Sequence, residues 1–288
     1  MHRTKWRLEQ IVIGLTLSCL FSFESNPVTA VETIKPLTNF LKGLNLTLPP
    51  KGAPGQRRSA GTRRDCPFEE FIALVPGTNF GLTTSERPTF WFYVPDSNKP
   101  KLQAEFWLRN KEHKDVYKET FRLQNTPGIV KITLPETVLP LVVEDLYRWR
   151  FSVICNPGEK RYKAFVYGGV ERISITSDLE KQLEGTNSRE RIAVYAQQGL
   201  WFDALTTLGE LRLANPQDKR LAQDWADLLE QVGLKEIESQ PLVDCCTVEN
   251  QRLMRELFNI KIRYLVFPVL CLLFLYFICY CYENYKKI

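Results

Sequence analysis

Four arginines stand close together in the stretch APGQRRSAGTRRDC, at residues 53–66. Guanidinium groups beside glycines suit phosphate or carboxylate ligands, because arginine donates paired hydrogen bonds and glycine lets the backbone approach closely. The candidate binding residues of this stretch are Arg57, Arg58, Arg63 and Arg64. The same composition also suits a linker, which needs only polarity and flexibility. Both interpretations stay open, and the linker is favoured.

A second set of candidate binding residues lies on two segments with strand-like alternation, KLQAEFWLRN (101–110) and YRWRFSVIC (147–155). Alternate residues of a strand face the same side of a sheet. If the two strands are neighbours, one face carries Trp107, Arg109, Arg148 and Arg150. Tryptophan among arginines is a common interface composition. Alternatively, Glu105 forms an ordinary ion pair with an arginine across the strands.

Four cysteines are candidates for disulfides in an exported protein: Cys66, Cys155, Cys245 and Cys246. Four cysteines allow three pairings. Strands of alternating direction would place Cys66 and Cys155 at the same end of a β-sandwich, which favours a direct bridge. In the alternative, Cys66 and Cys155 pair with Cys245 and Cys246 and attach the helices to the strands. A buried free thiol at Cys155 is a further possibility.

Residues for catalysis or metal binding are scarce in this chain. Beyond the first thirty residues His113 is the only histidine, and no Cys-x-x-Cys pair occurs, so we expect no metal and no cofactor. A Ser-His-Asp or Cys-His arrangement would need His113, which stands in a polar turn and is interpreted as a solvated residue. Paired carboxylates could serve glycoside hydrolysis only at a separation that sequence does not reveal. We therefore predict that the chain is not an enzyme.

The two ends of the chain carry apolar segments. A basic start, the apolar run IVIGLTLSCLF and the small residues VTA predict a signal peptide over residues 1–30. The uncharged run at residues 264–282 is a candidate transmembrane helix. Residues 31–65 carry seven basic and two acidic residues, whereas the whole 288-residue chain has a net charge of +5. This modest basic segment lacks interleaved aromatics, so we expect no nucleic-acid partner.

Between these ends the pattern changes from strands to helices. Seven short strand signals within residues 66–177 predict a β-sandwich of immunoglobulin or fibronectin type III order, with Tyr147 as a tyrosine corner and a bulge at Gly168-Gly169. Residues 178–240 predict a small helical domain, in which residues 188–218 have the spacing of one tetratricopeptide hairpin and residues 219–233 form a third helix. Residues 31–65 and 241–263 serve as linker and connector. The predicted fold class is α+β.

Several segments together resemble a cyanobacterial domain-of-unknown-function family, DUF928. They are APGQRRSAGTRRDC, GLTTSERPTFWFYVP, YRWRFSVICNP, ERIAVYAQQGLWFDALTTLGELR and DWADLLEQVGL followed by PLVDCC, within about residues 53–246. The resemblance implies an exported cyanobacterial protein without an assigned activity, and it supplies no catalytic residues.

The sequence thus predicts an exported, non-enzymatic protein of the periplasm or cell envelope, anchored by its C-terminal helix. Its partner would be an envelope protein or an anionic envelope component, bound by one of the two arginine groups. A carbohydrate-active enzyme with a sandwich fold is one alternative. A purely structural spacer is the other.

Overall fold

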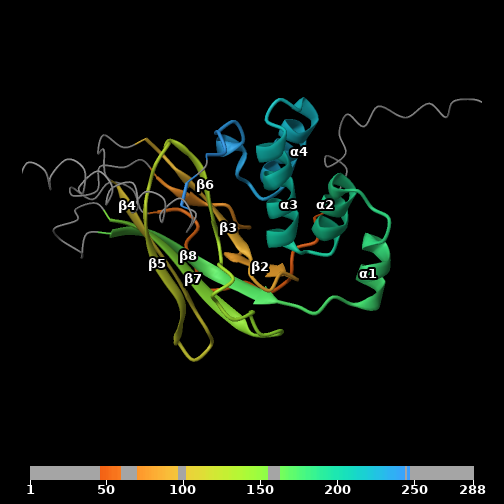
Figure 1. The fold of residues 1–288 in the computed structure, drawn as a ribbon, viewed down its shortest axis with the longest axis horizontal. Coiled ribbons are helices and arrows are strands. Elements are labelled where there is room, and N and C mark those ends of the chain that lie inside the picture. Colours follow the sequence, from red (N-terminus) through yellow and green to blue (C-terminus); the bar gives the residue numbers. More distant parts are fainter. Residues whose placement is uncertain (1–45, 60–69, 97–101, 155–162, 244, 247–288) are drawn as a thin grey trace, which may run out of the picture. The chain divides into compact units, whose positions relative to one another are not determined.

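Two β-sheets and four α-helices make up the part of the chain that the computed structural model describes, residues 46–59, 70–96, 102–154, 163–243 and 245–246 (Figure 1). The smaller sheet has the order β1 (Ile72–Ala73), β3 (Thr89–Val94) and β6 (Gly128–Thr133). The larger sheet has the order β2 (Phe80–Thr83), β8 (Lys163–Arg172), β7 (Leu146–Ile154), β4 (Gln103–Arg109) and β5 (Asp115–Arg122). The α+β class is confirmed.

Alternation in β4 and β7 produces one dry face and one partly exposed face on the larger sheet. Ala104, Phe106 and Leu108 are buried on the inner face, whereas the residues between them are half-buried. The inner faces of the two sheets meet through aromatic rings: Phe92 of β3 stacks on Phe151 of β7 with centroids 4.3 Å apart. Burial of these apolar side chains stabilises the paired sheets.

The segments predicted as strands all contain strands, and β2 is an additional one. It runs parallel to β8, with Phe80 opposite Gly169, whereas the other pairings are antiparallel. The predicted bulge at Gly168-Gly169 is wrong, because both glycines lie in a regular ladder opposite Trp149 and Arg148. Glycine is needed at 168 for close packing: a Cβ there would lie 2.5 Å from the indole ring of Trp149.

Tyr147 forms the contact expected of a tyrosine corner. Its hydroxyl oxygen accepts a hydrogen bond of 2.9 Å from the backbone N–H of Val142, five residues earlier. The ring itself is buried in the core. This bond fixes the turn that leads into β7, the strand that carries two of the candidate arginines.

The helices follow the strands in the order α1 (Ser177–Leu183), α2 (Ser188–Gln197), α3 (Trp201–Ala214) and α4 (Lys219–Gln231), with a short 3₁₀ turn, η1 (Lys235–Ile237). Asn187 and Glu190 form a capping box at the start of α2. Gly199, at φ +73°, forms the turn between α2 and α3, within the predicted hairpin of residues 188–218. The apolar residues of α4 and its C-cap are buried: Leu221, Trp225, Leu228, Leu229 and Val232.

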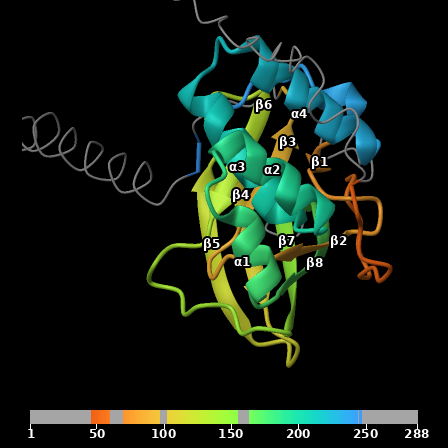
Figure 2. The same cartoon turned by 90° about the vertical axis from the view of Figure 1, so that its right-hand side faces the viewer.

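The helices do not form a core of their own. Helix α3 lies against β2 and β3 (Figures 1 and 2), and Trp91 of β3 meets Trp225 of α4 edge-on at 6.0 Å. The indole N–H of Trp201 donates to the carbonyl oxygen of Leu74 at 2.9 Å. The predicted boundary near residue 177 therefore separates the strands from the helices along the chain, but the two parts share one hydrophobic core.

Residues 46–59 depart from the linker that we expected. Gln56 and Tyr167 exchange backbone hydrogen bonds of 2.9 and 3.0 Å, and the Ala53 N–H donates to the Thr78 carbonyl at 3.1 Å. Polar composition suggested flexibility, but these backbone groups have partners on the sheet and in the loop before β2. This part of the segment is a strap over the folded unit.

Several predicted features lie outside the described residues: the signal peptide at 1–30, Arg63, Arg64, Cys66, Cys155 and the candidate span at 264–282. Within the described ranges, no helix has the length and apolar character to cross a membrane. Cys245 and Cys246 are joined to each other by a disulfide. This differs from the alternative in which each pairs with Cys66 or Cys155, and the state of those two stays a prediction.

Candidate functional site

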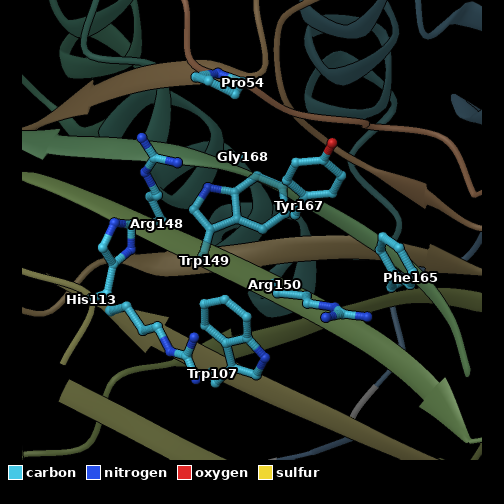
Figure 3. Close-up of a pocket in the computed structure, with 10 residues that line it drawn as sticks. Pro54, Trp107, His113, Arg148, Trp149, Arg150, Phe165, Tyr167 and Gly168 are labelled. Carbon is cyan, nitrogen blue, oxygen red and sulfur yellow. The ribbon is translucent and has the colours of Figure 1, made fainter. Parts of the chain in front are cut away.

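A pocket of about 260 Å³ opens on the outer face of the larger sheet (Figure 3). Strands β4, β7 and β8 supply most of its wall, and Pro54 of the N-terminal strap closes one side. Its lining residues are Pro54, Trp107, Arg109, His113, Arg148, Trp149, Arg150, Phe165, Tyr167 and Gly168. All four candidates that we predicted on the sheet face belong to this set.

The strand register brings the four predicted residues together. Strands β4 and β7 are antiparallel neighbours, with Trp107 opposite Arg150 and Arg109 opposite Arg148. Because alternate residues face the same side, all four side chains emerge on the outer face. The predicted adjacency of these two strands is confirmed.

Aromatic rings hold two of the guanidinium groups in place. The Arg109 guanidinium carbon lies 4.3 Å from the centroid of the Trp107 ring, and that of Arg150 lies 3.9 Å from the centroid of Phe165. A guanidinium stacked by its flat face keeps its N–H donors free in its own plane. These two arginines are therefore oriented before any ligand arrives.

The charges of the pocket are only partly compensated. The Arg109 Nε donates to the Asp115 carboxylate at 2.5 Å, but neither Arg148 nor Arg150 forms an ion pair with another described residue. The Nε of Arg150 is buried without a hydrogen-bond partner. Burial lowers the pKa of Arg150; the negative charge of Glu105 opposes this effect, and the positive charge of Arg109 adds to it. A guanidinium stays protonated at neutral pH even so.

The alternative interpretation, a cross-strand pair of Glu105 with an arginine, is met only in part: the negative charge of Glu105 raises the pKa of Arg150. Glu105 lies opposite Ser152 of β7 and Thr120 of β5. Its carboxylate forms an ion pair of 3.7 Å with Lys118 of β5. Glu105 thus compensates Arg150 only partly, because its ion pair is with Lys118.

Arg57 and Arg58 are occupied elsewhere. The Arg57 guanidinium donates to the carbonyl oxygens of Val75, Val232 and Gly233 at 3.2, 2.7 and 3.2 Å. Arg58 forms ion pairs with Glu70 and Glu236. Both residues attach the strap to neighbouring segments, so their interpretation as ligand-binding residues is not supported by the structure.

Sequence reasoning missed six residues that line the pocket: Pro54, His113, Trp149, Phe165, Tyr167 and Gly168. Phe165 and Tyr167 could have been found, because they alternate with buried Val166 in β8 and so share the outer face. His113 was interpreted as a solvated residue of a polar turn. His113 does lie in a turn, with φ +61°, and it is among the residues that line the pocket.

The described lining of the pocket consists mainly of arginines and aromatic rings, with His113 at its turn. No carboxylate is among the described lining residues. The described ranges also contain no group of three or more His, Cys, Asp or Glu residues that could hold a metal ion. Asp224 is buried, and its carboxylate forms an ion pair of 2.5 Å with Arg189.

A sequence family described as Domain of Unknown Function (DUF928) matches residues 53–242, which include the described part of the pocket. No curated protein matches the chain. Two solved structures show a slight likeness, both of β-glucuronidase from Parabacteroides merdae. One, with glycerol in its active site, has 14% identity and a TM-score of 0.21, over 41% of this chain and 12% of that one. The other has 9% identity and a TM-score of 0.23, over 67% and 29%. The chain thus spans less than a third of either protein, and likeness this low carries no argument.

Proposed function

The chain belongs to the family of unknown function DUF928, and we propose that it is an exported, non-enzymatic binding module for an anionic component of the cell envelope. The ligand occupies the pocket on the outer face of the larger sheet. In this proposal the signal peptide at 1–30 directs export, and residues 264–282 anchor the chain in a membrane.

One observation carries this proposal: Arg148 and Arg150 line the pocket, and neither forms an ion pair with a carboxylate of the described residues, although the charge of Glu105 acts on Arg150. Leaving the Nε of Arg150 buried without a partner costs free energy. An anion that accepts from these donors recovers that cost.

The finer fold assignments belong to the same proposal. The sheet orders β1-β3-β6 and β8-β7-β4-β5 support a fibronectin type III-like sandwich, to which β2 is added at one edge. The hydrogen bond from Val142 to the Tyr147 hydroxyl supports it further. We regard α2 and α3, joined at Gly199, as a tetratricopeptide-like hairpin that braces the smaller sheet.

Affinity electrophoresis of the full-length chain in mild detergent tests the binding function. Dextran sulfate in the gel should retard the wild type, whereas uncharged dextran should not. The variants Arg148→Glu and Arg148→Glu/Arg150→Glu should bind dextran sulfate at least tenfold more weakly. Arg191→Glu, which makes the same charge change at an exposed position of α2, is the control and should bind like the wild type. Equal retardation of all variants would show that the pocket does not bind anions.

A further inference from the structure

We propose that the ligand of the pocket is an acidic polysaccharide with several negative groups spaced along its chain. This inference rests on the proposed function and adds the chemical class of the ligand. Three features carry it: the separation of the arginines, their support by aromatic rings and the complete pairing of the strand backbones beneath them.

The three arginines surround the pocket instead of meeting at one point. Arg109 and Arg148 are opposite each other on neighbouring strands, and Arg150 is two residues further along β7, a step of about 6.6 Å along a strand. Figure 3 shows the side chains of Arg148 and Arg150 extending toward different sides of the pocket. A single small anion contacts only part of this set, whereas a chain with repeated charges can engage all of it.

The aromatic rings act on the arginines. Trp107 and Phe165 each carry a guanidinium over one face, at 4.3 and 3.9 Å. Stacking restricts the long side chains, so less conformational freedom is lost when a ligand binds. Trp107 and Phe165 are therefore positioning residues, and the ligand contacts are the N–H edges of the arginines.

The sheet backbone argues for a sugar chain over an acidic peptide. The backbones of β4, β7 and β8 hydrogen-bond to each other along the whole register that carries the pocket. A peptide laid across this face would find few backbone partners for its own N–H and C=O groups, and burying these groups unpaired is costly. A polysaccharide has no such backbone: its hydroxyls point outward into water while its acidic groups reach the arginines.

Calorimetric titration of the full-length chain in detergent tests this inference. The probes are oligogalacturonides of one to six residues, their carboxyl-reduced neutral counterparts, and oligoglutamates of the same charge. We expect affinity to rise about threefold for each added charge that an arginine engages, as for an exposed charge pair, so about tenfold from monomer to trimer. Longer oligomers should add little. Neutral counterparts should not bind, and oligoglutamates should bind at least tenfold more weakly than galacturonides.

Variants separate the roles of the residues. In the Arg148→Glu variant, affinity should no longer rise with the length of the oligogalacturonide, whereas in Arg191→Glu it should rise as in the wild type. Phe165→Leu should weaken trimer binding about threefold and leave the melting temperature unchanged, because leucine fills the space but does not hold the guanidinium of Arg150.

Each contrary result has a distinct meaning. Equal affinity for monomer and trimer would overturn the spaced-charge argument, and equal affinity for oligoglutamate would overturn the sugar class. In both cases the anion-binding function would stand if the binding of dextran sulfate is still weakened by Arg148→Glu. Loss of that dependence would remove the proposed function together with this inference.

Discussion

Replacing Arg57 by methionine tests whether the basic strap is part of the fold or a linker. Methionine keeps a chain of similar length and removes the guanidinium. In the structure this group donates to the carbonyl oxygens of Val232 and Gly233, which follow α4, and to that of Val75 beside the smaller sheet. One side chain thus joins the strap, the sheet and the end of the last helix.

The expected loss of stability follows from these three bonds. A hydrogen bond from a charged donor contributes about 1.5–3 kcal/mol when it is well buried. The guanidinium of Arg57 is half-buried, the bond to Gly233 is exposed and only the bond to Val232 is short, at 2.7 Å. We therefore count roughly one full bond and two weak ones, about 3 kcal/mol in total. For a folded unit of this size, the melting temperature should fall by about 6–12 °C.

Urea denaturation of the full-length chain, followed by tryptophan fluorescence, measures this change. Arg191→Met is the matched control, because Arg191 is exposed on α2, and it should change the free energy of unfolding by less than about 0.5 kcal/mol. Arg57→Lys should recover only part of the loss, since lysine cannot reach three carbonyl groups at once.

A loss for Arg57→Met no larger than that of the control would refute this reasoning. The strap would then contribute nothing to the fold, and the linker interpretation of residues 31–65 would hold for this part as well. Affinity for dextran sulfate should stay unchanged in Arg57→Met below its melting temperature, because Arg57 does not line the pocket.

Two further predictions concern the core. In an ordinary helix Gly→Ala stabilises by up to about 1 kcal/mol. Gly209→Ala should instead destabilise the chain by about 1–3 kcal/mol, because the new methyl group would lie 2.6 Å from the Trp91 ring. A denaturation experiment in which this variant is more stable than the wild type would contradict the close contact between α3 and β3. Burial raises the pKa of Tyr117 to about 12. The contribution of Tyr117 to stability should therefore be constant below pH 10 and be lost between pH 10 and 12, because this tyrosine loses its proton first in the unfolded chain. Tyr117→Phe should flatten this part of the pH profile and be neutral or stabilising at pH 7, since the hydroxyl is buried without a partner; an unchanged slope would assign the pH dependence to another group.

Much of the pocket could be predicted because it depends on two short-range regularities. Alternation along β4 and β7 set which side chains face outward, and the order of strand signals suggested that these two strands are neighbours. Together they placed Trp107 and Arg109 near Arg148 and Arg150, and the register then sets Trp107 opposite Arg150 and Arg109 opposite Arg148. His113 and Pro54 could not be placed in this way, because a turn and a distant strap bring them to the pocket.

The role of the arginines near the N-terminus was misjudged for a related reason. Composition does not tell a flexible basic segment from one whose arginines have partners far away in the chain. The partners of Arg57 are Val232 and Gly233, more than 170 residues later. Their approach depends on where α4 packs, which no local pattern contains.

Local sequence therefore determined the elements themselves: alternating strands, capped helices, the turn at Gly199 and the buried stripe of α4. These follow from backbone geometry and from the period at which apolar side chains recur. Tertiary structure alone decided that the helices cover the smaller sheet. The run TFWFYV of β3 is buried almost throughout, with Phe92 facing the larger sheet and Trp91 facing α4. A strand that is apolar on both faces requires two covers, but only long-range packing selects which elements provide them.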